Sequence, residues 1–274
     1  MRKIIIILLI LFIVIIIWQI YLPISFGSTE IIFRIEKGEG SREIAINLEH
    51  EGLIWWGPVF RVYVYTTGVS KNLQAGTYSL SKTMNMPNIV EKFTSGDIAK
   101  TTITIPEGFD AEQIYQKLSG ITDVNLADLE AKEGYLFPDT YEIPYGISSQ
   151  EIIKIMTDNF DKKTAGLEIT REGIIMASII EREVRTKEDK EQVSGLLWKR
   201  LRAGMPLQVD SAPETYERRG LPSEPICSPG LESITAAVYP KASQYWYYLS
   251  TPEGKTIFSK TLEEHNIARA KYLK

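Results

Sequence analysis

The sequence of 274 residues contains little cysteine and little histidine. A single cysteine, Cys227, excludes an intrachain disulfide framework. The two histidines, His50 and His265, lie far apart and argue against a histidine-rich metal site. Basic residues do not outnumber acidic ones, and the net charge of −4 gives no overall attraction to nucleic acid. We therefore expect no metal, no cofactor and no nucleic-acid partner.

The motifs of several common enzyme classes are also missing. The sequence has no H-E-x-x-H, no G-x-S-x-G and no P-loop, which argues against zinc proteases, α/β-hydrolases and P-loop nucleotide enzymes. Cys227 has no histidine near it in the sequence, which favours a packed thiol over a nucleophile. His265 is a candidate base, with a surface or capping role as the alternative.

One long apolar run stands near the N-terminus. Residues 4–18 are all apolar, and after one glutamine the run continues to about 19 apolar residues, close to the ~20 that a helix needs to cross a bilayer. Arg2 and Lys3 precede the run and no basic residue follows before Arg34, which predicts an N-terminus in the cytoplasm. We expect a membrane anchor over residues 1–24. The remaining chain has 29 basic and 35 acidic residues, a net charge of −6.

A cleaved signal peptide is the alternative for this run. The apolar core is long for a signal peptide, and no clear A-x-A cleavage motif follows it, although residues 25–28 (SFGS) do not exclude cleavage. The sequence favours the anchor, with Trp18 and Tyr21 at the far membrane interface.

The rest of the chain mixes short strands and helices. Strands are expected at residues 31–35, 75–80, 245–249 and near 257, and helices at 150–160, 170–186, 188–203, 231–238 and from about 262. This mixture predicts an α+β fold and not a doubly wound sheet.

The segment 174–185 (IIMASIIEREVR) is the most informative. On a helical wheel of about 100° per residue, Glu183 falls within the apolar arc, roughly 200° from Glu181. Glu181 has a partner in Arg185 at i+4, whereas Glu183 has none within the helix. A carboxylate on an apolar face is costly unless it is paired or functional, and burial of such a group favours general-acid chemistry. The alternative is a structural ion pair of Glu183 with a buried arginine such as Arg200 or Arg202.

A second group of polar residues follows the helix 188–203. Gln208 and Asp210 lie on one short extended stretch, where an amide and a carboxylate suit sugar hydroxyls. The alternative is ordinary turn chemistry, with Asp210 capping the next element.

Several short stretches, taken in their order and spacing, are specific to one family. They are residues 75–78 (AGTY), 133–141 (EGYLFPDTY), 177–183 (ASIIERE), 200–210 (RLRAGMPLQVD), 220–230 (GLPSEPICSPG) and 264–266 (EHN). With the N-terminal anchor, the chain resembles over essentially its whole length the YceG-like (MltG) family of membrane-anchored endolytic murein transglycosylases. The resemblance implies a bacterial cytoplasmic-membrane anchor at 1–24, a small LysM-like α/β module at 25–100 and a mixed α+β lytic-transglycosylase-like catalytic domain at 101–274. It implies peptidoglycan glycan strands as substrate, with cell-wall synthases as family-level partners.

The resemblance also implies a mechanism. The family's catalytic glutamate, the second in A-S-I-x-E-x-E, falls on Glu183. Protonated Glu183 would protonate the glycosidic oxygen between MurNAc and GlcNAc, and its carboxylate would then take the proton of the MurNAc 6-hydroxyl, which closes a 1,6-anhydro end without water. Gln208, Asp210 and Tyr216 are the expected substrate contacts.

Two alternatives remain open. A hydrolytic muramidase of the same fold would need a second carboxylate, for which Asp210 and Asp139 are candidates. A non-catalytic anchored scaffold would bind glycan through residues 31–100. The chain departs from the family in a shorter loop after Asp210, in residues 214–216 (ETY in place of Asn-Thr-Tyr) and in lacking a histidine before Phe258.

Overall fold

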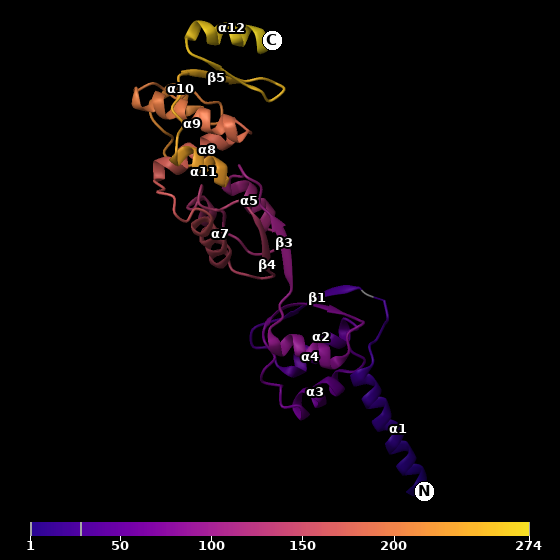
Figure 1. Ribbon diagram of the computed structural model, residues 1–274. Helices are drawn as coiled ribbons and strands as arrows, with labels where there is room; N and C mark the ends of the chain where they lie inside the picture. The colour runs from indigo at the N-terminus through magenta and orange to yellow at the C-terminus, as the bar shows by residue number, and fades with distance from the viewer. Residues whose placement is uncertain (1, 28, 274) are drawn as a thin grey trace. The chain divides into compact units, whose positions relative to one another are not determined.

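The computed structural model describes residues 2–27 and 29–273. The chain mixes helices with short strands that pair into two-stranded sheets, which confirms the predicted α+β class (Figure 1). The chain forms two compact units. The first contains the residues up to Thr101 together with Ile143–Gly146, and the second contains Thr102–Glu142 and the residues from Ile147 on. The functional domain limits after residues 24 and 100 stay predictions.

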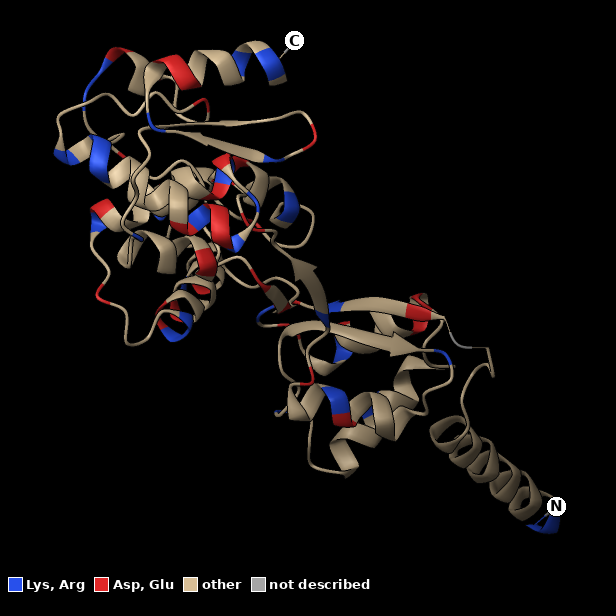
Figure 2. Ribbon diagram, turned by 45° about the horizontal axis from the view of Figure 1, so that its top comes forward, with Lys and Arg blue, Asp and Glu red and all other residues tan. Residues whose placement is uncertain are grey.

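Helix α1 (Arg2–Tyr21) is apolar on every side, and none of its described residues is buried. Figure 2 shows Lys and Arg at its start and uncharged residues along the rest of it. Among the described residues it is the one helix that is long and apolar enough to cross a membrane, although a signal sequence meets the same criteria. The predicted apolar helix is confirmed, and its retention as an anchor stays a prediction.

In the first unit, strands β1 (Glu30–Ile35) and β2 (Gly76–Ser81) pair antiparallel, with Glu30 opposite Ser81 and Ile35 opposite Gly76. Two helices, α2 (Ser41–His50) and α3 (Gly57–Thr66), connect the strands, and α4 (Met86–Ser95) follows β2. The inward side chains of the sheet and of these helices form one apolar core. The LysM-like character of this unit stays a prediction.

A second pair of strands, β3 (Lys100–Thr104) and β4 (Thr140–Pro144), carries the chain out of the first unit and back to it. Helices α5 (Ala111–Leu118) and α6 (Leu126–Glu130) lie between these strands in the chain. Asp110 caps α5, because its carboxylate accepts from the Gln113 N–H at 2.9 Å. The cap fixes the end of the loop 107–110.

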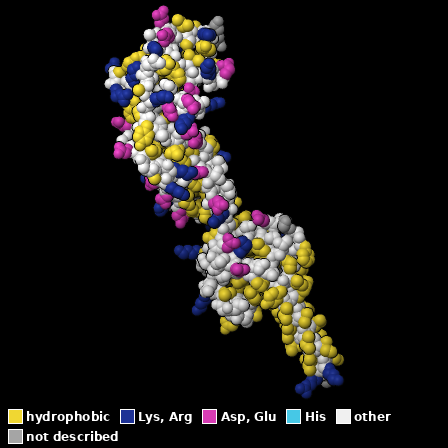
Figure 3. All heavy atoms as spheres, in the orientation of Figure 1, with side chains coloured by type: hydrophobic (Ala, Val, Ile, Leu, Met, Phe, Trp, Pro, Cys, Tyr) yellow, Lys and Arg dark blue, Asp and Glu magenta, His cyan; other side chains and the backbone are white. Residues whose placement is uncertain are grey.

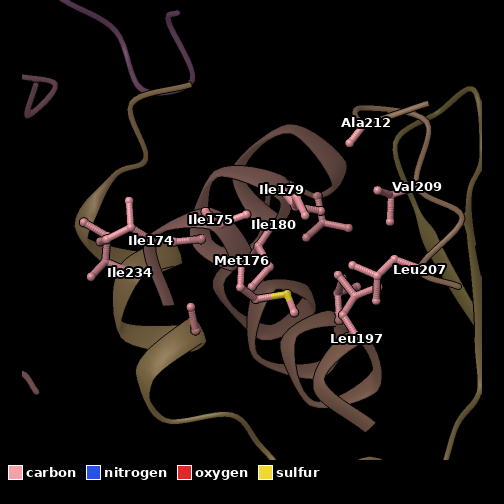
Figure 4. Packing of buried hydrophobic residues seen from close by; sticks show 14 of the residues in the cluster. Ile174, Ile175, Met176, Ile179, Ile180, Leu197, Leu207, Val209, Ala212 and Ile234 are labelled. Carbon is pink, nitrogen blue, oxygen red and sulfur yellow. The ribbon is translucent and has the colours of Figure 1, made fainter. Parts of the chain in front are cut away.

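The second unit is built around helix α8 (Arg171–Glu183), whose residues 173–180 are all buried. It packs against α9 (Lys187–Arg202) and α11 (Leu231–Val238). Helix α7 (Ser149–Lys163) and the short α10 (Glu214–Glu217) belong to the same unit. Figure 4 shows the isoleucines of α8 together with Leu197 and Ile234 from the two neighbouring helices. Leu207, Val209 and Ala212 join the same core, which anchors the 207–212 segment beside α8.

The chain ends in a hairpin and a helix. Strand β5 (Tyr247–Ser250) pairs antiparallel with β6 (Thr256–Ser259), and α12 (Leu262–Tyr272) packs on both strands. The aromatic strand expected at 245–249 therefore begins two residues later.

Candidate active site

A cleft of about 1080 Å³ opens in the second unit. Its volume is slightly above the usual range of small-molecule sites, about 300–1,000 Å³, which suits an extended substrate. The loop 107–110, the last turn of α8, the 208–216 segment, β5 and α12 form its walls. Its lining residues are Glu107, Gly108, Phe109, Asp110, Gln113, Arg182, Glu183, Arg200, Gln208, Asp210, Ser211, Tyr216, Tyr247, Tyr248, Leu249, Ser250, Leu262, His265, Arg269 and Leu273.

Glu183 is the last residue of α8, and its side chain lines this cleft. The helix predicted over 170–186 ends earlier because Val184 is extended, with φ −143° and ψ 155°. Val184 is buried in the core, and Thr186 caps α9 through its hydroxyl, which accepts from the Asp189 N–H at 3.2 Å. Packing of Val184 and capping of the next helix thus place Glu183 at an exposed helix end beside the cleft.

Both carboxylate oxygens of Glu183 accept hydrogen bonds. The backbone N–H of Ser211 donates to Oε1 at 3.0 Å, and the hydroxyl of Tyr248 donates to Oε2 at 2.8 Å. Among the described residues, no lysine or arginine forms an ion pair with Glu183. The structural ion pair with Arg200 or Arg202 is therefore wrong, and a half-buried carboxylate faces the cleft between two neutral donors.

Arg200 positions the elements that hold Glu183. Its buried guanidinium donates from Nη1 to the carbonyl of Leu207 at 2.6 Å and from Nε to the carbonyl of Trp246 at 2.7 Å. It therefore ties the segment that carries Ser211 to the strand that carries Tyr248.

Glu181, two residues earlier, has a different environment. Its Oε1 lies 3.2 Å from Lys190 Nζ, and its Oε2 accepts from the Gly230 N–H at 2.9 Å and from the Ser233 hydroxyl at 2.7 Å. The expected pair with Arg185 is wrong, because Arg185 lies beyond the end of α8. Glu181 does not line the cleft and caps the N-terminus of α11 in place of a local side chain.

Gln208, Asp210 and Tyr216, the expected substrate contacts, all line the cleft and are exposed. The Tyr216 hydroxyl donates to Asp210 Oδ1 at 2.6 Å, and this hydrogen bond raises the pKa of Tyr216 to about 12. Gln208 has φ +53°, the left-handed region that side chains other than glycine rarely adopt. Such backbone strain is common at functional sites. The structure brings the three residues together with Glu183, and substrate binding by them stays a prediction.

Sequence reasoning missed Tyr248 and Ser211, the two residues that hold the Glu183 carboxylate. Tyr248 belongs to the aromatic strand that the sequence indicates, yet no local pattern tells which of its tyrosines faces Glu183. Burial and the nearby Glu183 raise the pKa of Tyr248 well above its ordinary value, so the hydroxyl keeps its proton and donates.

Of the three remaining candidate residues, His265 lines the cleft, whereas Asp139 and Cys227 do not. His265 lines the cleft and stacks on Tyr247, with ring centroids 5.3 Å apart, and burial lowers its pKa. Asp139 does not line the cleft and forms an ion pair with Lys163 at 2.9 Å, and this contact lowers its pKa to about 2. Cys227 is buried, and burial raises the pKa of its thiol to about 12, as expected for a packed thiol. Within residues 2–27 and 29–273, no cluster of three or more His, Cys, Asp or Glu side chains could hold a metal ion.

Comparisons with known proteins match this chain over most of its length. A family model described as the YceG-like family matches residues 33–214 and 212–271. The endolytic murein transglycosylase of Bacillus subtilis (strain 168) is 29% identical over 89% of this chain and 85% of that protein. A protein of the same name from Streptococcus pneumoniae serotype 2 is 25% identical, over 89% of this chain and 59% of that protein. The crystal structure of a yceG-like protein from Listeria monocytogenes has a TM-score of 0.52 and 28% identity over 88% of this chain and 100% of that chain. The chain therefore belongs to the YceG-like family.

Proposed function

We propose that this protein is a peptidoglycan lytic transglycosylase that cuts nascent glycan strands internally, with Glu183 as general acid and then base. One observation carries the proposal: the Glu183 carboxylate faces a polar cleft without an ion-pair partner among the described residues and is held on both oxygens by neutral donors. Relatives named endolytic murein transglycosylase support the substrate class.

The hydrogen bonds of Glu183 support a different role for each of its oxygens. A backbone N–H can only donate, so Oε1, which faces Ser211, accepts in both protonation states. The transferable proton of the neutral acid therefore resides on Oε2, next to the Tyr248 hydroxyl. When that proton leaves, Tyr248 donates to the oxygen on which negative charge develops, and such a preorganised donor lowers the barrier.

The reaction follows in two steps on one residue. Glu183 Oε2 gives its proton to the glycosidic oxygen, the bond to MurNAc C1 breaks with its electron pair on the departing GlcNAc, and an oxocarbenium-like centre forms. The carboxylate then takes the proton of the MurNAc 6-hydroxyl, and that oxygen bonds to C1. The product is a 1,6-anhydro end, and Glu183 is protonated again.

A hydrolytic muramidase is the second candidate, because Asp210 lies in the same cleft and could hold a water. Asp139, the other carboxylate considered for this role, is held by Lys163 outside the cleft lining. Gln208 and Tyr216 would bind sugar hydroxyls in either reaction. We also propose that α1 anchors the protein in the cytoplasmic membrane, N-terminus inside, with the remaining chain and its synthase partners outside.

The test is digestion of purified glycan strands by the full chain in detergent, with the products identified by mass spectrometry. We expect anhydro-MurNAc ends from the wild type, and a loss of about 10²–10⁴-fold in Glu183→Gln, the usual size of a general acid–base contribution. Glu172→Gln, the same substitution on an exposed residue in the first turn of α8, serves as the control. Cleavage that persists in Glu183→Gln contradicts the acid assignment. Reducing ends indicate the hydrolase, and a wild type that binds glycan without cleaving it indicates the scaffold.

A further inference from the structure

Helix α3 and the two residues before it expose an apolar surface. Trp55, Trp56, Val62 and Tyr65, which we call the α3 surface, are between 44% and 79% exposed. The opposite side of the same helix, including Phe60 and Val64, lies in the core of the first unit. A helix that is apolar on both sides needs an apolar partner outside the protein as well as inside it.

The charge of this segment is also unusual for an exposed surface. Between Gly52 and Gly68 the sequence has a single charged residue, Arg61, and no acidic residue. Arg61 is exposed on α3 beside Val62. The interface of an anionic membrane attracts segments of this composition, in which tryptophan, tyrosine and a basic side chain lie among apolar residues.

The α3 surface adjoins the end of helix α1. The ring of Trp18 packs against that of Trp55 with centroids 5.3 Å apart, and Ile16 and Ile20 pack against the core of the first unit. Helix α1 contacts both α3 and α4. Figure 3 shows the hydrophobic side chains of α1 continuing onto the first unit where the helix joins it.

The length of α1 determines how deep in the bilayer these contacts lie if the helix spans it. The part of α1 before Ile16 is only ~21 Å long at 1.5 Å per residue, whereas the hydrocarbon core of a bilayer is ~30 Å thick. If α1 spans the bilayer, its last turns must reach the outer interface. The surface that packs on Ile16 and Ile20 then lies at the same level, within the ~5–10 Å depth that interfacial helices occupy.

We infer that the α3 surface docks on the outer leaflet of the membrane, with its aromatic side chains among the lipid headgroups and Arg61 at the phosphates. The inference rests on the proposed anchor and goes beyond it, because an anchor requires only that α1 spans the bilayer and calls for no contact between α3 and lipid. A second, lateral contact with lipid fixes the orientation of the first unit to the membrane plane.

The experiment uses the full chain in vesicles of phosphatidylcholine and phosphatidylglycerol, with brominated phosphatidylcholine as a quencher of tryptophan fluorescence. Three variants each keep one tryptophan, Trp18, Trp56 or Trp198, with the others changed to phenylalanine. We expect the lipid quencher to cause a loss of Trp56 fluorescence comparable with that of Trp18, and no loss for Trp198, which is partly buried against the core of the second unit.

The outcomes separate the two proposals. Quenching of Trp18 without Trp56 overturns the docking and leaves the anchor, whereas no quenching of Trp18 overturns the anchor and the docking with it. In the variant that keeps Trp56, Val62→Asp should reduce the quenching and Ile46→Asp should not. Val62 and Ile46 are 59% and 57% exposed on two helices of the same unit, and only the former belongs to the α3 surface. An equal effect of both substitutions also contradicts the inference.

Discussion

The hydroxyl of Tyr248 lies 2.8 Å from Oε2 of Glu183, although 65 residues separate them in the chain. The contact joins the last turn of α8 to strand β5 across the cleft. Tyr248 is held there because Arg200 donates to the carbonyl of Trp246, just before the strand. The orientation of Glu183 thus depends on elements of the second unit that lie far apart in the sequence.

Removal of this hydroxyl tests its part in the reaction. Tyr248→Phe keeps the buried ring and removes the hydrogen bond to Glu183, so we expect kcat to fall roughly tenfold or more, the value of one hydrogen bond to a charged group, with little change in KM. The measurement is the rate of release of anhydro ends.

Tyr245→Phe is the matched control, because Tyr245 packs on Phe258 and its hydroxyl has no hydrogen bond among the described residues. A purely structural role for Tyr248 would lower the stability of the variant and leave the kcat of the folded protein unchanged, against this prediction.

Glu181 should matter for stability and not for chemistry. Its side chain is 8% exposed and that of its partner Lys190 is 3% exposed. Glu181→Gln removes the near counter-charge of a buried ammonium and leaves it only the more exposed carboxylate of Glu107, 4.0 Å away, which costs about 3 kcal/mol of the free energy of unfolding. Urea denaturation of the detergent-solubilised chain measures the loss.

The double variant Glu181→Leu, Lys190→Met removes both charges and should recover most of that stability, because no buried charge is left unpaired. If Glu181→Gln unfolds at the wild-type urea concentration but loses cleavage, then Glu181 and not Glu183 carries the chemistry.

The sequence predicted the catalytic candidate better than its surroundings. Glu183 stood out because a carboxylate interrupts an apolar arc, a pattern visible within one helix. The end of α8 could not be predicted, since Val184 continues the apolar pattern and leaves the helix only to fill the core. The partner of Glu181 was missed for a related reason: Lys190 lies on the next helix, and the helical i+4 rule considers only Arg185.

The fold shows the same division between local and distant information. The helices with a clear apolar face and the strand at 31–35 were predicted from the sequence, because their signals lie in their own residues. Contacts between residues far apart in the sequence, such as Ser211 with Glu183, were not predicted, because they depend on how the 207–212 segment packs beside α8. Arg200 also holds that segment in place, and nothing in the sequence beyond the presence of an arginine indicates this role.

Glu133 predicts a dependence of stability on pH. Burial raises its pKa from 4.5 to about 7, although Oε2 accepts from the Ala111 N–H, and Oε1 is buried without a partner among the described residues. The folded state therefore binds the proton more tightly than the unfolded state. The resulting stability is fully present below pH 4.5 and is lost as the pH rises through about 7.

Glu133→Gln cannot ionise, so the stability of the wild type should fall relative to this variant over that pH interval. Urea denaturation at several pH values measures the difference. The control is Glu130→Gln, since Glu130 is exposed in the same segment. Parallel pH curves for the wild type and Glu133→Gln would rule out Glu133 as the titrating group.

Asp210 and Tyr216 distinguish the lyase from the hydrolase. In a lyase the pair only contacts substrate, so both Tyr216→Phe, which removes the 2.6 Å hydrogen bond between them, and Asp210→Asn, which keeps an acceptor oxygen but removes its charge, should raise KM and leave anhydro ends as the product. In a hydrolase Asp210 would be the base that activates water, and Asp210→Asn would then abolish turnover while Tyr216→Phe would not. Steady-state kinetics with mass spectrometry of the ends separates the two cases. Because only Asp210→Asn removes the carboxylate, a much larger loss of kcat in Asp210→Asn than in Tyr216→Phe contradicts the assignment of Glu183 as the sole acid and base.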